Sequence, residues 1–129
     1  MKVVDAVPDF LDRFPSLEVF LQSARFHAGH TYTGDMIPAR SNAPTFFGPD
    51  LSVAQYAYDL ADPMLYVVTR DDLHPVAGMP FAVGPIVAVR HEVPILAHVN
   101  PMVANGLSRR ALYAEIVTAL DQQLTRDGI

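Results

Sequence analysis

One stretch of the chain, residues 45–73, limits the possible folds more than any other. Asp50 offers a side-chain acceptor to the free N–H groups at the start of a helix. Pro63 ends that helix at about Asp62, because proline lacks an N–H and disfavours helical geometry at the residue before it. The next residues, MLYVVT at 64–69, are rich in β-branched and aromatic side chains, as is typical of a buried strand. The stretch predicts a short apolar strand, a capped helix and a second strand.

An amphipathic helix is predicted near each end of the chain. Ser16 is a suitable N-cap for a helix over residues 17–29, in which apolar residues form a stripe and Gly29 supplies the stop. Ser108 is a suitable N-cap for a closing helix after the Asn105-Gly106 turn. The apolar face of this closing helix consists of Leu112, Tyr113, Ile116, Val117, Leu120 and Leu124.

The segments between these helices are short and end at glycine or proline. Strands are predicted at residues 31–33, 45–47 and 64–69, and one or two more within residues 86–99. Pro94 belongs at an edge, a bulge or a turn, because it cannot donate a hydrogen bond to a neighbouring strand. Together the elements predict an α+β fold with a small mixed or mostly antiparallel sheet, in one globular domain over residues 1–129.

Composition limits the classes of function. Half of the residues are hydrophobic, 18% are charged and the net charge is −5, which indicates a packed domain and disfavours nucleic acid as a partner. The chain has no cysteine, which excludes disulfides and thiolate chemistry and fits a reducing compartment. An acid and a proline interrupt the first ten residues, and no apolar run approaches the roughly 20 residues of a membrane span. We therefore expect a soluble, cytoplasmic protein without a membrane partner.

Common catalytic motifs are missing from the sequence. The glycines form neither G-x-G-x-x-G nor a P-loop, and there is no G-x-S-x-G. His27 and His30 are close in sequence, but no cysteine or carboxylate lies at a familiar ligand spacing, so zinc stays open without support. We interpret His27 as a cation near the carbonyls at a helix C-terminus and His30 as a strand-edge residue. No metal site is predicted.

Four short motifs follow one another between residues 32 and 73. They are YTG at residues 32–34, TFFGPD at 45–50, VAQYA at 53–57 and, after a strand, RDDL at 70–73. Their order and spacing resemble the front half of small ADP-ribosyltransferase-like domains. The likeness covers residues 30–73 and extends to HEV at 91–93, which is similar to the strand that carries the family's glutamate.

The resemblance implies an enzyme that uses NAD as a substrate and transfers ADP-ribose to a macromolecular target, as a toxin or effector-like protein does. It implies Glu92 as the catalytic residue, which would stabilise positive charge as the bond to nicotinamide breaks. It assigns NAD binding to Tyr32, Thr33, Gly34, Arg40 and Tyr56.

Each of these residues has an expected role in holding NAD. The rings of Tyr32 and Tyr56 would sandwich the nicotinamide. The backbone at Thr33 and Gly34 would meet the carboxamide. Arg40 would neutralise the diphosphate. The alternative roles are ordinary structural ones, as core-edge aromatics and as a solvent-exposed acid and base.

A second hypothesis, from another functional class, stays open beside the enzyme. Thr33 stands where the family usually has histidine or arginine ahead of the glycine, which fits a domain that has lost catalysis. High apolar content with few charges also favours surfaces that are covered by other chains. The chain would then be a non-enzymatic interaction or assembly subunit, which packs on a protein partner or on copies of itself.

Overall fold

A computed structural model describes residues 4–6, 9–40, 42–57, 60–76 and 86–127. At its centre lies a four-stranded sheet in the order β1-β8-β5-β2. Its strands are β1 (Val4–Ala6), β8 (Ala97–Val99), β5 (Pro63–Thr69) and β2 (Ala24–His30). The two long strands pair antiparallel along their whole length, from Ala24 opposite Thr69 to His30 opposite Pro63. Every strand pair in the described part of the chain is antiparallel.

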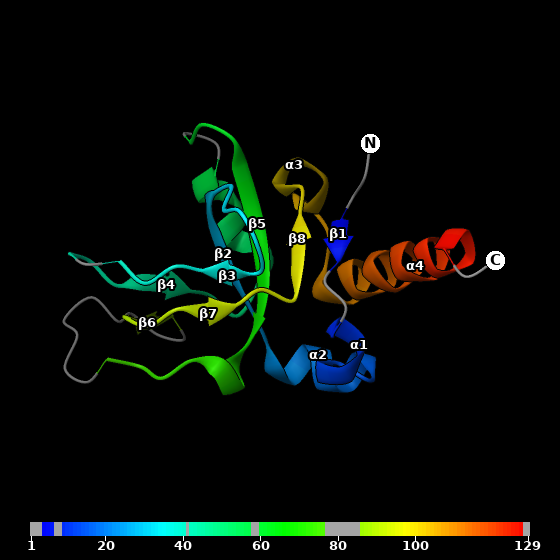
Figure 1. Cartoon of the computed structure of the whole chain (residues 1–129), viewed down its shortest axis with the longest axis horizontal. Coiled ribbons are helices and arrows are strands. Elements are labelled where there is room, and N and C mark those ends of the chain that lie inside the picture. The colour runs from blue at the N-terminus through cyan, green and yellow to red at the C-terminus, as the bar shows by residue number, and fades with distance from the viewer. Residues whose placement is uncertain (1–3, 7–8, 41, 58–59, 77–85, 128–129) are drawn as a thin grey trace.

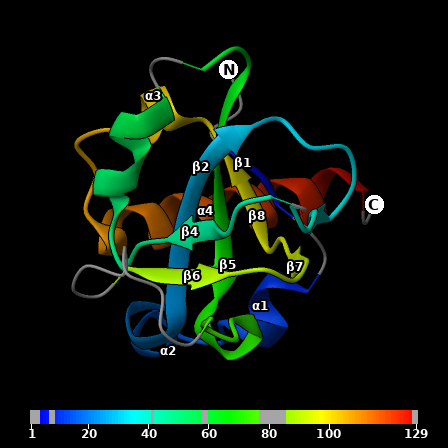
Figure 2. The same cartoon turned by 90° about the vertical axis from the view of Figure 1, so that its left-hand side faces the viewer.

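The sheet lies between a layer of helices and a thin layer of short strands. Figure 1 shows the helices on one side, and Figure 2 shows the short strands in front of the sheet. The helices are α1 (Phe10–Arg13), α2 (Leu17–Ser23), α3 (Pro101–Ala104) and α4 (Arg109–Asp127). The strands of this outer layer pair as β3 (Met36–Ile37) with β7 (Val93–Pro94) and β4 (Thr45–Phe47) with β6 (Val87–Val89). The 3₁₀ helices η1 (Leu51–Ala57) and η2 (Arg70–Asp72) flank β5 in the sequence.

Each face of the central sheet has its own core, because successive side chains of a strand point to opposite faces. The first core, under the helices, consists of Phe10, Phe14, Phe20, Ala24, Phe26, Leu51, Ala54, Leu65, Val67, Leu96, Ala97, Val99, Ala104, Leu112 and Ile116. The second core, under the outer layer, consists of Ile37, Phe47, Tyr66, Val68, Leu73, Val89, Val93 and Ile95. Strand β5 therefore contributes alternately to both cores.

The structure confirms the α+β class and several of its local signals. Ser16 caps α2 by accepting from the Val19 N–H at 3.2 Å, and Ser108 caps α4 by accepting from the Ala111 N–H at 3.0 Å. Pro94 lies in β7, which pairs with β3 alone. On the closing helix, the predicted apolar positions Leu112 and Ile116 are fully buried, Tyr113 and Leu120 pack beside them and Val117 is half-buried. The side chain of Leu124 lies outside the described part.

The predicted helix over residues 17–29 is wrong in its second half. Helix α2 ends at Ser23, and the next residues form β2, because this segment pairs with all seven residues of β5. The strand predicted at residues 31–33 is therefore absent, since the strand ends at His30. Alternation explains the result: Ala24 and Phe26 are buried in the first core, while Arg25 and His27 lie on the other face.

The helix predicted at residues 50–62 is only partly correct. Asp50 accepts from the Ser52 N–H at 2.9 Å and from the Ser52 hydroxyl, as a capping residue does. The helix that follows is a 3₁₀ helix and ends at Ala57. Residues 58–59 lie outside the described part, and Asp62 has a φ of 49°, so the chain turns there before β5. Helix α3 and strand β3 were not predicted, and residues 86–99 hold three strands.

Among the described residues, no helix has both the length and the apolar character that crossing a membrane requires.

Candidate functional site

A pocket of about 390 Å³ opens where β4 separates from the edge of the central sheet. Phe26 of β2 and Gly48 exchange two backbone hydrogen bonds of 2.9 Å, and this bridge is isolated. Beyond it the two strands enclose a space between them. The pocket is lined by His27, Ala28, Arg40, Phe46, Phe47, Gly48, Val53, Tyr56 and Ile86. Most of the wall that the described residues form is apolar, and its polar side-chain groups are one imidazole, one guanidinium and one phenol.

The His27 ring is held in one tautomer. Its Nδ1 lies 3.0 Å from the carbonyl oxygen of Phe46. Because a carbonyl oxygen can only accept, Nδ1 carries the proton and Nε2 keeps a free lone pair. Burial lowers the pKa of His27 below its ordinary value of 6.5, the bond to Phe46 opposes this shift, and the charge of Arg40 adds to it. The ring is therefore neutral at neutral pH and presents an acceptor at Nε2.

The space beside Nε2 requires glycine at position 29. A Cβ at Gly29 would lie 2.8 Å from His27 Nε2 and 3.4 Å from the hydroxyl oxygen of Tyr32. The first distance is shorter than real Cβ contacts, so any other residue would displace the imidazole. The missing side chain thus lets the His27 ring lie against the backbone of β2 with the Tyr32 hydroxyl nearby.

Tyr66 fixes the segment that carries Tyr32. The Tyr66 hydroxyl donates to the His30 carbonyl at 2.5 Å and accepts from the Tyr32 N–H at 2.8 Å. The two tyrosine rings stack with centroids 5.2 Å apart, and the His27 ring stacks on Tyr66 at 6.2 Å. Burial raises the pKa of Tyr66, so its hydroxyl stays protonated and keeps donating. One face of the Tyr32 ring is therefore already covered by protein.

Ala28 presents a backbone donor and acceptor to the pocket. In an antiparallel ladder, residues two apart direct their N–H and C=O groups to the same side. Phe26 uses both groups toward Gly48, so Ala28 directs its pair toward the same outer edge. No backbone group in the described ranges bonds to Ala28 on that side. A planar amide has the matching acceptor and donor.

The structure brings together only part of the predicted site. Arg40 and Tyr56 line the pocket, and the side chain of Tyr56 is 73% exposed. Tyr32 packs on Tyr66 and does not line the pocket. Thr33 and Gly34 are exposed in the segment before β3, where Gly34 has a φ of 85°. Glu92 is exposed just before β7 and does not line the pocket either.

His27 is the polar pocket residue that the sequence did not reveal. Its interpretation as a cation at a helix C-terminus is wrong, because His27 lies in the middle of β2, four residues beyond α2. The sequence ARFHAGH alternates, with Ala24, Phe26 and Ala28 on one face, and this pattern could have indicated a strand that carries His27 on its other face. His30 ends the same strand, is exposed and contacts the Ala61 carbonyl through Nδ1 at 3.1 Å.

No group of three or more histidine and carboxylate side chains in the described part of the chain is placed to hold a metal ion. Comparisons with protein-family models, with curated proteins and with solved structures find no match to this chain.

Proposed function

We propose that this pocket binds the nicotinamide end of NAD, and that the protein transfers ADP-ribose from NAD to a macromolecular target. One observation carries the proposal: His27, Tyr56 and the free edge of Ala28 meet at a single pocket of about 390 Å³. A flat ring with a carboxamide suits these groups, because the phenol offers a stacking surface and Ala28 offers a backbone donor and acceptor.

The sequence motifs acquire partly new roles in this proposal. The motif expects a basic residue ahead of a glycine, and Thr33 is not basic. His27, two residues before Gly29, supplies that basic residue instead. Ala28 takes the contact to the carboxamide that the motif assigned to Thr33 and Gly34. Arg40 keeps its expected role, since a guanidinium at the pocket wall suits the diphosphate of NAD.

The transfer step breaks the bond between C1′ of the ribose and the nicotinamide nitrogen. Nicotinamide leaves with the bonding electrons, and a nucleophile of the target bonds to C1′ and releases its proton. Positive charge develops on the ribose, so a carboxylate nearby lowers the barrier. Glu92 is the residue proposed for this role. Because its carboxylate lies outside the pocket lining, binding and transfer are tested separately.

Calorimetry with NAD and with nicotinamide tests the binding step. Tyr56→Ala should weaken both ligands about tenfold, because aromatic stacking contributes roughly 1 kcal/mol beyond buried area. Met102→Ala is the matched control, since Met102 is 65% exposed on α3 and does not line the pocket. Absence of binding at millimolar NAD would refute the proposal.

The transfer step is tested by the release of nicotinamide in the presence of a candidate target. Glu92→Gln should leave NAD affinity unchanged and abolish release, because it removes the charge and keeps the side-chain size. Release at the unchanged rate would remove Glu92 from the mechanism while leaving the binding proposal intact.

A second candidate function is supported by exposed apolar side chains in and beside the outer layer. Met36 of β3 is 36% exposed, Phe46 of β4 is 39% exposed and Tyr56 is 73% exposed. Such side chains suit a surface that packs on a partner chain or a second copy. Sedimentation velocity at micromolar concentration distinguishes the two forms of this candidate, because a strict monomer would exclude self-association. The lack of cysteine fits the cytoplasm for either function.

A further inference from the structure

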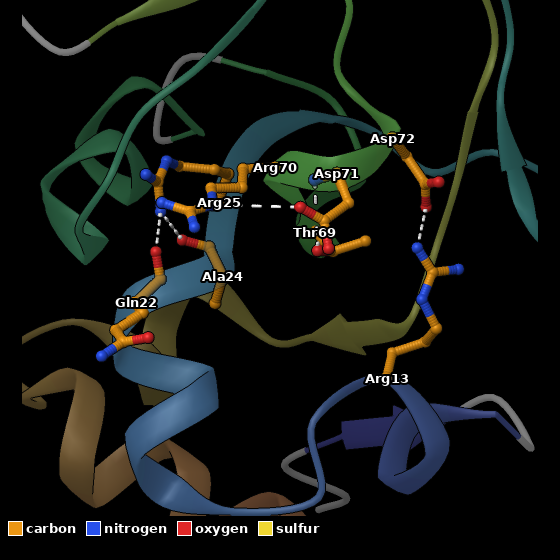
Figure 3. Close-up of polar contacts among 8 residues, drawn as sticks. All are labelled: Arg13, Gln22, Ala24, Arg25, Thr69, Arg70, Asp71 and Asp72. Carbon is orange, nitrogen blue, oxygen red and sulfur yellow. Dashed lines mark hydrogen bonds and ion pairs between the residues drawn. The ribbon is translucent and has the colours of Figure 1, made fainter.

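Two arginines from distant parts of the chain meet at the end of α2. Arg25 of β2 donates through Nη1 to the carbonyls of Gln22 at 3.2 Å and Ala24 at 2.8 Å (Figure 3). Arg109, the first residue of α4, donates through Nη1 to the carbonyl of Leu21 at 2.8 Å. The acceptors lie within four residues, so the two guanidinium groups are held close to each other.

A third arginine joins them from the end of β5. In Figure 3, the side chain of Arg70 extends to the same side as that of Arg25. Burial lowers the pKa of Arg25, and the charges of Arg70 and Arg109 lower it further. The positive charges of Arg70 and Arg109 therefore both act on Arg25. We call Arg25, Arg70 and Arg109 the arginine cluster.

The described carboxylates leave this cluster incompletely neutralised. Asp71 lies 3.9 Å from Arg70 Nε, but both side chains are more than half exposed, and such pairs contribute little. Asp72 pairs instead with Arg13 at 2.9 Å. Asp50 feels the charge of Arg109, while its bonds go to Ser52.

Capping of α2 does not account for the whole cluster. The carbonyl contacts use one nitrogen of Arg25 and one of Arg109, whereas a guanidinium has five N–H donors. Arg70 makes no capping contact in the described part of the chain. The remaining donors form planar forks, which match the oxygens of a phosphate group.

We propose that the arginine cluster binds a phosphate-bearing anion. Arg25 lies two residues before His27 on the same face of β2, about 7 Å along the strand. The anion can therefore be a separate phosphate compound or a phosphate of the molecule in the pocket. Binding of a phosphate by the cluster does not depend on the proposed use of NAD.

Titration with inorganic diphosphate, followed by NMR signals of arginine side chains at constant ionic strength, tests the inference. We expect saturable binding that Arg70→Gln weakens about tenfold, because one charge-assisted contact is lost. The side chain of Arg70 is 55% exposed and contacts Asp71 alone among the described residues, so this variant should fold. Arg90→Gln is the matched control, since Arg90 is also exposed but lies beyond β6.

Two outcomes would overturn the inference: no saturation with diphosphate, or equal weakening by Arg70→Gln and Arg90→Gln, which would indicate a general charge effect. Competition then identifies the source of the phosphate. Diphosphate that displaces NAD but not nicotinamide, and does so less effectively in Arg70→Gln, would assign the cluster to a phosphate of the pocket ligand. Diphosphate that displaces neither would assign it to a separate compound.

Discussion

Gly29 decides whether the His27 ring can occupy its position in the pocket. Its Cα faces Nε2 so closely that a single added carbon would be only 2.8 Å away. The imidazole cannot move without losing the 3.0 Å bond from Nδ1 to Phe46, which holds its tautomer. The requirement for glycine here is a matter of space, because no positive φ is involved at this position.

Gly29→Ala should therefore destabilise the protein by about 1 to 3 kcal/mol, the usual cost of an overpacked site. Urea denaturation measures this change. In a His27→Ala background the same substitution should cost less, because the clashing ring is gone. An equal cost in both backgrounds would show that the contact with His27 is not the cause.

The lowered pKa of His27 gives folding stability a defined pH dependence. Above the ordinary value of about 6.5 the ring is neutral in both states, so His27 contributes no pH dependence. As the pH falls below that value, the unfolded chain binds the proton first, and the free energy of unfolding decreases until the pH reaches the lower pKa of the folded protein.

His27→Gln should accordingly reduce the loss of stability as the pH falls below about 6.5. Urea denaturation of both proteins across this range measures the difference, and an NMR titration of the ring measures the pKa directly. Identical pH profiles for the two proteins would contradict a buried neutral ring.

At the level of elements, local signals predicted where helices begin better than where they end. Ser16 and Ser108 start α2 and α4 as predicted, because capping depends on residues within one turn. The end of α2 depends on pairing between β2 and β5, whose partners are about 40 residues apart. Periodicity alone could not separate a continuing helix from a strand in ARFHAGH, since apolar residues fit both patterns there.

The caps of these two helices should each be worth about 1 kcal/mol. Ser16→Ala and Ser108→Ala remove the acceptors for the first free N–H groups, and urea denaturation measures the loss. Ser23→Ala is the control, because Ser23 ends α2 and caps nothing in the described structure. A cost for Ser23→Ala equal to that of the cap variants would mean that capping is not the origin of the effect.

At the scale of the whole molecule, the pocket exists because the outer layer of short strands covers the central sheet less completely than the helices do. The central sheet is buried on both faces, whereas the outer layer consists of strands of two or three residues. Tyr56 was predicted from the VAQYA motif and Arg40 from the loop between two motifs, and both line the pocket. The positions of Tyr32 and Glu92 could not be predicted, because they depend on how the outer layer docks on the sheet, and no local pattern encodes that docking.

The difference between the buried central sheet and the thin outer layer should appear as different rates of amide hydrogen exchange. Amides of β5 should exchange most slowly, because Leu65 and Val67 lie in the first core and Tyr66 and Val68 in the second. Amides of β3 and β7, which share a ladder of two residue pairs, should exchange much faster. Comparable protection in β3, β7 and β5 would contradict this ranking.

Hydrogen exchange measured with and without ligand tests the pocket directly, because β4 forms a wall of the pocket and β3 does not. A molecule bound between β2 and β4 is held by both strands, so closing the space should slow exchange at Phe46 and Phe47. The change should be absent in β3 and, for nicotinamide, should disappear in Tyr56→Ala. If exchange instead slowed equally in the β3–β7 pair and the β4–β6 pair, the ligand would be stabilising the whole fold from another site.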